Sequence, residues 1–308
     1  MENSKNNLNL KASVIIPTYN RANLIGRTIK SILNQTYQDF EIVVVDDSPN
    51  DETEKVVKGF NDKRIKYIHN KEKTNLPKAR NQGVRESSSD SKYIAFLDDD
   101  DQWLPHFLEK TTNALEKDSE IAMATTYARL MTHKEEILRE IRCEHDKFWQ
   151  QTIGSGCIIR KEIFTKENLW YDERKVIEDV DFGLRVLKNH KWKCIPEVLR
   201  IYHPYPLPRE TSASSALPLK EIELFYEKHY PTYAQLGKKA LADFYFKVGR
   251  EFLKSKEIKK GRKNLLSAFL TYPNLKYFFY YLISLFFPKI FQSIRIRILK
   301  EKIFRGRI

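Results

Sequence analysis

Glycine-rich phosphate-binding loops are missing from this sequence of 308 residues, which contains only 10 glycines. Neither Gly-x-Gly-x-x-Gly nor Gly-x-x-x-x-Gly-Lys-Ser/Thr occurs, which argues against a Rossmann dinucleotide-binding site and against a P-loop. A nucleotide could still bind if a metal ion bridged its phosphates in place of a glycine cradle.

Cysteine is equally scarce. Cys143, Cys157 and Cys194 are odd in number and widely spaced, and they match neither a zinc-binding pattern nor a disulfide framework. We therefore expect a reducing, cytoplasmic environment.

Long apolar runs are also lacking. Residues 277–287 are apolar but are ended by Pro288, whereas a membrane-spanning helix takes ~20 apolar residues. The chain does not open on a basic segment followed by an apolar one, so we expect no signal peptide. A hydrophobic content of 41% and a charged content of 31% are typical of a globular protein, with one large domain or one domain plus an appendage.

The net charge of +13 is confined to one end of the chain. Residues 220–308 hold 20 Lys and Arg against 7 Asp and Glu, whereas residues 1–219 hold 34 of each sign. The charge is therefore a property of a basic tail and of the partner of that tail.

The first hundred residues alternate between apolar runs and helical periodicity. Buried strands are predicted at residues 12–17, 40–45, 65–68 and 93–97, and helices at 24–33, 53–60 and 79–87. This alternation predicts a parallel sheet with helices on both faces, which is the α/β class.

Two of the predicted strands end in acidic residues, at Asp46-Asp47 and at residues 98–101. Because parallel strands place equivalent ends on one edge, both groups should face the same crevice. Adjacent carboxylates repel one another, and a bound divalent cation would offset that repulsion. The alternative is a solvated acidic turn.

Four motifs occur in the order and spacing found in family 2 glycosyltransferases. They are Ser-Val-Ile-Ile-Pro-Thr-Tyr-Asn at 13–20, Val-Val-Asp-Asp-Ser at 44–48, Ala-Arg-Asn-Gln-Gly at 79–83 and Phe-Leu-Asp-Asp-Asp-Asp at 96–101. The chain resembles this family over residues 11–205. The resemblance implies the GT-A fold, a Rossmann-like, mostly parallel sheet with flanking helices. It also implies an inverting enzyme with a divalent metal, Mn²⁺ or Mg²⁺, and a nucleoside diphosphate sugar donor, for which we expect a UDP-sugar. The expected acceptor is a hydroxyl of a cell-surface glycan, a polysaccharide or a lipid-linked oligosaccharide.

The resemblance also implies roles in donor binding. Pro17 and Tyr19 would line the nucleobase pocket, with Tyr19 stacking on the base. Asp46 would accept a hydrogen bond from the base, and Arg80 would reach the base or the diphosphate. The alternatives are an ordinary turn aromatic for Tyr19, a turn or capping pair for Asp46 and Asp47, and a solvated helix face for Arg80.

For the metal, the resemblance implies that Asp98 faces the ribose and the cation and that Asp100 is the main ligand. Asp101 matches a further acid of many members, and Asp99 fills a variable position without a role. His203 is a further candidate near the diphosphate or the metal, although a lone histidine is more often structural or exposed.

Inversion requires a carboxylate that removes the proton of the acceptor hydroxyl on the face opposite the leaving group. Glu178 and Asp179 begin a predicted helix, and the resemblance matches Asp179 to the catalytic base. Glu178 would then support orientation of the acceptor. The alternative is a pair of acids that complement the helix dipole. Asp181 is expected on the helix surface.

The remaining segments complete the predicted organisation. We expect a flexible N-terminus at 1–11, a glycosyltransferase domain at 12–205, a Pro/Ser-rich linker or lid at 206–218 and a basic helical region at 219–308. Within the domain we expect a helix at 103–115, a strand at 121–127 and a variable loop near the acceptor within 129–148.

The tail allows three interpretations. Residues 241–273 have the rhythm of a helix pair similar to one tetratricopeptide unit, and aromatic and basic residues follow. Such helices suit peripheral attachment to the anionic cytoplasmic face of a membrane, or they pack on the body with a solvated basic face. The rival is a nucleic-acid- or membrane-binding protein whose basic tail carries the function, on a catalytically silent body. The neutral body and the absence of a nucleic-acid motif argue against it, so we expect no nucleic acid.

Overall fold

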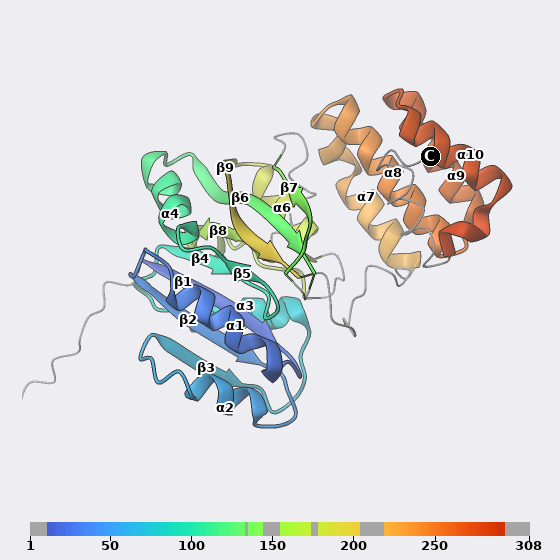
Figure 1. The fold of residues 1–308 in the computed structure, drawn as a ribbon. Coiled ribbons are helices and arrows are strands. Elements are labelled where there is room, and N and C mark those ends of the chain that lie inside the picture. Colours follow the sequence, from blue (N-terminus) through green and yellow to red (C-terminus); the bar gives the residue numbers. More distant parts are fainter. Residues whose placement is uncertain (1–10, 133–134, 144–154, 174–177, 204–218, 293–308) are drawn as a thin grey trace, which may run out of the picture. The chain divides into compact units, whose positions relative to one another are not determined.

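The computed structural model describes residues 11–132, 135–143, 155–173, 178–203 and 219–292. The chain divides into two compact units, residues 1–206 and residues 207–308 (Figure 1). The predicted linker at 206–218 and nearly all of the predicted flexible N-terminus lie outside the described residues.

The first unit is built on a sheet whose described strands follow the order β3-β2-β1-β4-β8-β6-β9-β5, with β7 paired to β6. The strands are β1 (Ala12–Thr18), β2 (Phe40–Asp46), β3 (Ile65–His69), β4 (Tyr93–Phe96), β5 (Gln102–Trp103), β6 (Ile121–Met131), β7 (Ile137–Ile141), β8 (Cys157–Arg160) and β9 (Lys191–Tyr202). Strands β1 to β4 pair in parallel, whereas β8 pairs antiparallel with both β4 and β6. The predicted α/β class with a mostly parallel sheet is confirmed, and the antiparallel strands lie beyond β4 in the strand order.

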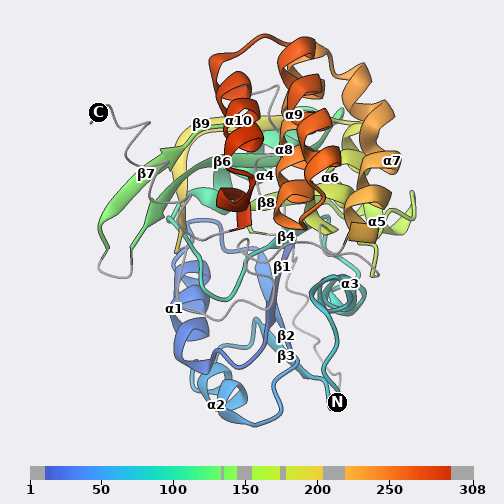
Figure 2. The same cartoon turned by 90° about the vertical axis from the view of Figure 1, so that its right-hand side faces the viewer.

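Helices cover both faces of this sheet. They are α1 (Ala22–Leu33), α2 (Glu52–Lys58), α3 (Leu76–Glu86), α4 (Phe107–Lys117), α5 (Glu162–Thr165) and α6 (Glu178–Leu187). Figure 2 shows α1 and α3 on opposite sides of β1 and β2. Strands β1 and β2 are thereby flanked by helices from two sides.

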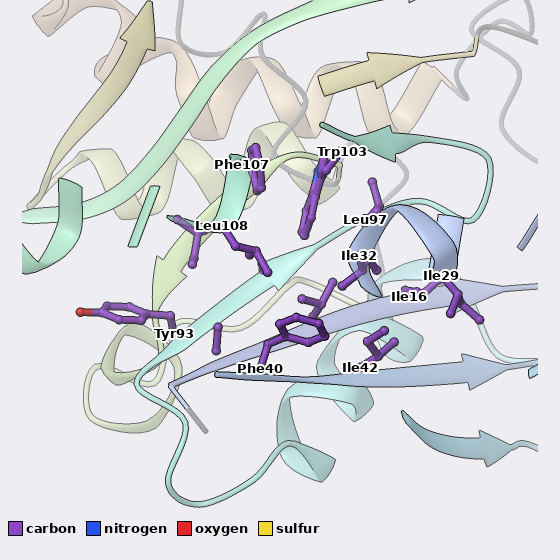
Figure 3. Close-up of a cluster of buried hydrophobic side chains, with 14 of the residues drawn as sticks. Ile16, Ile29, Ile32, Phe40, Ile42, Tyr93, Leu97, Trp103, Phe107 and Leu108 are labelled. Carbon is purple, nitrogen blue, oxygen red and sulfur yellow. The ribbon is translucent and has the colours of Figure 1, made fainter. Parts of the chain in front are cut away.

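Strand residues alternate between two cores because successive side chains of a strand point to opposite faces. Ile16 joins a cluster with Ile29 of α1 and Ile42 of β2 (Figure 3). Ile15 belongs to the other cluster, on the side of α3. A Cβ added to Gly83 of α3 would lie 2.2 Å from Cγ2 of Ile15, so only glycine lets α3 approach β1 this closely.

Two predicted elements need correction. The helix predicted from residue 103 begins at Phe107, because Trp103 pairs with Arg200 across β5 and β9. Part of the stretch 129–148, where a variable loop is predicted, forms a hairpin, since β6 continues to Met131 and pairs with β7; residues 133–134 and 144–148 lie outside the described residues. The side chains of β7 are exposed or only half-buried, so the strand carries no clear apolar alternation in the sequence.

The expectation of no disulfide is also wrong, because Cys143 and Cys194 are joined with a Cα–Cα distance of 6.1 Å. Cys143 follows β7, and Cys194 lies in β9 opposite Thr125 of β6. Both neighbouring strands pair with β6, which brings together two cysteines that are far apart in the sequence. Cys157 is a buried thiol, and burial raises its pKa to about 11.

The second unit is helical, as predicted. It contains α7 (Leu219–Gln235), α8 (Lys238–Lys254), α9 (Ile258–Thr271), α10 (Leu275–Phe286) and the short 3₁₀ helix η2 (Pro288–Gln292). Phe246 of α8 packs against Tyr277 and Tyr280 of α10, and the Tyr277 hydroxyl donates a hydrogen bond of 2.7 Å to Asp243. Among the described residues, no helix combines the length and the apolar character needed to cross a membrane.

Candidate functional site

Four acids follow β4 at the crevice edge of the sheet, and three of them are buried. Asp99, Asp100 and Asp101 are 4%, 2% and 4% exposed, so the acidic segment is not a solvated turn. Carboxylate oxygens of Asp98, Asp100 and Asp101 lie within 4.8 Å of one another. An all-oxygen donor set of this kind fits a hard divalent cation.

Helix α1 fixes the backbone of this acidic loop. The Thr28 hydroxyl lies 2.9 Å from the carbonyl oxygen of Asp99 and 2.8 Å from that of Asp101, and Nη2 of Arg27 donates to the carbonyl of Asp100. Helix α1 therefore holds the backbone carbonyls of residues 99–101, and this keeps the carboxylates of the loop grouped.

The side chain of Asp99 turns toward the end of β1. Its Oδ2 accepts a hydrogen bond of 2.7 Å from the Thr18 hydroxyl, and its Oδ1 accepts one of 2.8 Å from Nη1 of Arg21. The same Nη1 lies 3.0 Å from Oδ2 of Asp100. Burial raises the pKa of Asp99 to about 7, with Arg21 opposing the rise and Asp100 adding to it. Asp99 thus bonds to protein groups on both carboxylate oxygens.

Asp101 is held from the opposite direction. Its Oδ2 accepts a hydrogen bond of 2.7 Å from the Ser155 hydroxyl, and its Oδ1 accepts one of 3.1 Å from the backbone N–H of His203. Burial and the charges of Asp100 and Asp98 raise its pKa well above the usual value. His203 is only 1% exposed, which excludes an exposed histidine, and its backbone N–H bonds to the acidic loop.

Arg200 is a residue that the sequence did not single out. It is 1% exposed and donates to the Thr126 carbonyl from Nε and Nη2 and to the Ser155 carbonyl from Nη1, at 3.2, 2.6 and 3.2 Å. Gly156 makes room for it: the residue has φ +116°, and a Cβ there would lie 2.2 Å from Cδ of Arg200. The glycine before a buried strand was the only signal of this approach.

Arg80 connects the acidic loop to the start of α6. Its side chain is 2% exposed, so it does not lie on a solvated helix face. Nη2 donates to Oδ1 of Asp98 at 3.1 Å, and Nη1 donates to Oε1 of Glu178 at 2.8 Å. Burial alone would lower the pKa of Arg80, but Asp98 and Glu178 raise it above its ordinary value. Two acids from distant parts of the sequence thus share one guanidinium.

Glu178 and Asp179 open α6 with perturbed acidities. Burial raises the pKa of Glu178 to about 7, opposed by Arg80 and reinforced by Asp179. Burial also raises the pKa of Asp179, whose half-buried carboxylate accepts a hydrogen bond of 2.8 Å from the Val180 N–H. A carboxylate with a raised pKa is a stronger proton acceptor when it is ionised.

Asp181 is not on the helix surface as expected. It is fully buried, and Oδ2 accepts a hydrogen bond of 2.8 Å from Nε of Arg185, one turn further along α6. Arg185 also donates to the Trp170 carbonyl, so this pair joins α6 to the preceding segment. The apolar stripe in the sequence did not include this acid, whose buried carboxylate is paired with the arginine.

The residues predicted for base binding lie at the ends of β1 and β2. Pro17 is buried opposite Val45, and Tyr19 follows the strand, half-buried, with Nζ of Lys73 4.0 Å from its ring centroid. Asp46 is fully buried, with Oδ1 accepting from the Ser48 N–H and Oδ2 from the Tyr67 hydroxyl. Its role as acceptor for a base stays a prediction.

The neighbouring Asp47 has a role that the sequence did not indicate. It accepts hydrogen bonds from Nδ2 of Asn70 at 2.7 Å and from the hydroxyl and N–H of Thr74 at 2.6 and 3.1 Å. The segment that carries Lys73 is therefore fastened beside the crevice.

Residues 13–172 match the family model of Glycosyl transferase family 2. An uncharacterized glycosyltransferase of Methanocaldococcus jannaschii is 30% identical over 70% of this chain and 77% of its own length. A glycosyltransferase of Rickettsia bellii is 41% identical, but the match covers 39% of this chain and 17% of that protein. WfgD of Escherichia coli, a UDP-Glc:alpha-D-GlcNAc-diphosphoundecaprenol beta-1,3-glucosyltransferase, is 37% identical over 35% of this chain and 42% of its own length.

Solved structures share the fold. Staphylococcal (S. aureus) TarS 1–349 in complex with UDP-GlcNAc has a TM-score of 0.63 at 17% identity, covering 97% of this chain and 93% of that one. The mannosyltransferase PcManGT of Pyrobaculum calidifontis, in complex with GDP-Man and Mn²⁺, has a TM-score of 0.55 at 13% identity, covering 92% and 86%. These likenesses confirm the predicted GT-A fold.

Proposed function

The chain belongs to glycosyl transferase family 2, and on that premise we propose that it is a metal-dependent, inverting glycosyltransferase that uses a UDP-sugar. The proposal rests above all on Arg80, which bonds to Asp98 of the acidic loop and to Glu178 at the start of α6. Leaving-group stabilisation and proton removal need groups that face one reaction centre from two directions. One guanidinium bound to both acids supports such an arrangement.

On this proposal the donor lies at the carboxyl ends of β1, β2 and β4. Pro17 and Tyr19 line the base pocket, Asp46 accepts from the base, and Arg80 and Asp98 face the diphosphate and the ribose. A nucleoside diphosphate is supported by the ligands of both structural relatives, UDP-GlcNAc and GDP-Man. A uridine nucleotide is supported by the name of WfgD and by the UDP-GlcNAc bound to TarS.

The cation would be held by Asp98 and Asp100, with Asp101 and His203 beside them. When bound, a divalent ion stabilises the negative charge that grows on the departing diphosphate. Mn²⁺ and Mg²⁺ both accept carboxylate oxygens. The protein keeps the ligands grouped through Thr28, which fixes the loop backbone.

Acceptor activation is assigned to α6. Asp179 removes the proton of the attacking hydroxyl. Glu178 orients the acceptor, and Arg80 holds the Glu178 carboxylate in place. The acceptor class is a cell-surface glycan, a polysaccharide or a lipid-linked oligosaccharide, supported by the diphosphoundecaprenol acceptor in the name of WfgD.

A thermal-shift panel tests the donor and the cation together. Wild type, Asp100→Ala and the exposed-acid control Asp90→Ala are melted with UDP-, GDP-, dTDP- and CMP-sugars, with Mn²⁺ or with EDTA. We expect a UDP-sugar to stabilise wild type and Asp90→Ala only when Mn²⁺ is present, and not to stabilise Asp100→Ala. Equal stabilisation of all three proteins in EDTA would contradict the metal site.

The basic unit is proposed to bind the anionic cytoplasmic face of a membrane. Leu275, Phe286 and Phe287 at the two ends of α10 are 86%, 73% and 61% exposed, and residues 220–308 carry the whole net charge of +13. Exposed apolar residues beside positive charge are what interfacial helices use on anionic lipid. A nucleic-acid-binding tail is not favoured, because large apolar side chains are exposed beside the positive charge and no nucleic-acid-binding motif occurs in the sequence.

Vesicle sedimentation tests this assignment. Wild type should sediment with phosphatidylserine vesicles but not with phosphatidylcholine vesicles, and Phe286→Ser with Phe287→Ser should weaken the association. Binding to RNA that exceeds binding to anionic vesicles would favour the rival instead.

The Cys143–Cys194 disulfide opposes the cytoplasmic assignment, because disulfides are rare in reducing compartments. Alkylation of thiols in intact cells before lysis decides this point. Blocking of both cysteines supports the cytoplasm, whereas their protection overturns it.

A further inference from the structure

Asp99 occupies the position to which the family resemblance gives no role, yet it anchors both ends of one turn. Thr18, the last residue of β1, donates to Oδ2 over 2.7 Å, and Arg21, directly before α1, donates to Oδ1 over 2.8 Å. The turn between these two residues contains Tyr19, proposed to stack on the base. The position of Tyr19 therefore depends on an acid in the metal loop.

The turn itself has a single defined conformation. Asn20 has φ +53°, a left-handed value that asparagine tolerates better than most residues, and its N–H donates a hydrogen bond of 2.8 Å to Oγ of Ser48. With its centre bonded to the β2 end and both flanks bonded to Asp99, the turn cannot shift without breaking these contacts.

Arg21 has a second partner in the same loop. Its Nη1 lies 3.0 Å from Oδ2 of Asp100, the proposed main metal ligand. A guanidinium and a divalent cation at one carboxylate repel each other, and the repulsion is strong where the groups are withdrawn from water. A cation that binds Asp100 therefore competes with Arg21.

We propose that Asp99 and Arg21 form a positioning pair that couples the metal loop to the nucleobase turn. When the cation takes Asp100, Arg21 keeps its bond to Asp99, and Tyr19 stays in place. This inference rests on the proposed function, since it requires a cation and a nucleotide at these two places. Its consequence is that Arg21 opposes the metal while it supports the base.

The experiment measures two affinities separately on the full chain. Mn²⁺ binding is followed by electron paramagnetic resonance without nucleotide, and uridine binding by NMR titration in EDTA. Uridine has no phosphate, so it reports the base pocket without a direct contact to the cation. For Arg21→Gln we expect Mn²⁺ to bind more tightly and uridine more weakly, each by about fivefold or more, the lower end of typical couplings between sites. A general loss of structure would weaken both.

Further variants separate charge from position. Asp99→Asn should lower the affinities for both Mn²⁺ and uridine, because Asp100 is then the one carboxylate that binds Arg21. Thr18→Val leaves the charges intact, so it should lower the affinity for uridine and leave the affinity for Mn²⁺ unchanged. This variant still tests the inference if Arg21→Gln folds poorly. Lys30→Gln is the matched control, since it removes one positive charge from an exposed position of α1, and neither affinity should move by more than about twofold.

The outcomes distinguish this inference from its premise. If wild type binds neither Mn²⁺ nor uridine, the proposed function falls and the positioning pair with it. If wild type binds both, and Arg21→Gln changes neither affinity or weakens both, only the positioning pair is overturned.

Discussion

The hydroxyl of Ser155 donates a hydrogen bond of 2.7 Å to Oδ2 of Asp101, across a sequence separation of 54 residues. Oγ of Ser155 also accepts a hydrogen bond of 3.2 Å from the backbone N–H of Asp98, and the Ser155 carbonyl accepts one from Arg200. One serine therefore joins the acidic loop to the buried arginine of β9.

Ser155→Ala should destabilise the protein by about 1–3 kcal/mol, because a buried carboxylate and a backbone N–H lose their partner. Chemical denaturation gives this value. Mn²⁺ affinity should fall in the same variant, since Asp101 is no longer held beside Asp100. Unchanged stability together with unchanged Mn²⁺ binding would show that Ser155 does not order the loop.

Gly156→Ala should be far more costly than Gly237→Ala, although both glycines have positive φ, +116° and +99°. Nothing lies within 4 Å of a Cβ at Gly237, so that change costs only backbone strain, about 1–3 kcal/mol. At Gly156 the new methyl group displaces Arg200, and a buried charge that loses its partners costs about 3–5 kcal/mol in addition. Denaturant midpoints of the two variants compare the costs, and equal values would contradict the steric argument.

Glu178 should make folding stability fall as pH rises. Its pKa in the folded protein is about 7 against 4.5 in an unfolded chain, so the folded state binds this proton more tightly between those values. Stability contributed by the group is complete below about 4.5 and is lost as pH rises through about 7, by at most roughly 3 kcal/mol.

Glu178→Gln removes this titration, so its stability curve should be flatter than that of wild type between about pH 4.5 and 7. Subtraction of the two curves cancels the groups that do not interact with Glu178, whereas Asp179, which does, contributes to the difference. Parallel curves over this window would mean that Glu178 keeps an ordinary pKa in the folded protein.

Asp179→Asn should lower kcat/KM by about 10²- to 10⁴-fold, the usual contribution of a general base, while donor binding in the thermal-shift assay is retained. In wild type, kcat/KM should fall as pH decreases through the raised pKa of Asp179, because the protonated acid cannot accept a proton. This acidic limb lies above the usual aspartate value. A variant that retains wild-type activity would move the assignment of the base elsewhere.

Local signals in the sequence were sufficient for much of the fold. The apolar runs of β1, β2 and β4 and the acids at their ends depend on residues that are neighbours in the chain, so strand positions and the shared crevice edge were predictable. The order and spacing of the four motifs indicated the family. The helical character of the tail followed from its periodicity and composition.

Only the tertiary structure decided which charged groups meet. Arg80 is bound to both Asp98 and Glu178, Asp181 is buried by Arg185, and Cys143 reaches Cys194 because their segments flank β6. The Asp181–Arg185 pair has the i,i+4 spacing of a helix, but its burial and the other contacts have no local signature, since a charged residue on a helix is expected to be solvated unless its surroundings are known. Periodicity reports which face of an element is buried, whereas the pairing of polar groups inside that face depends on how distant elements pack.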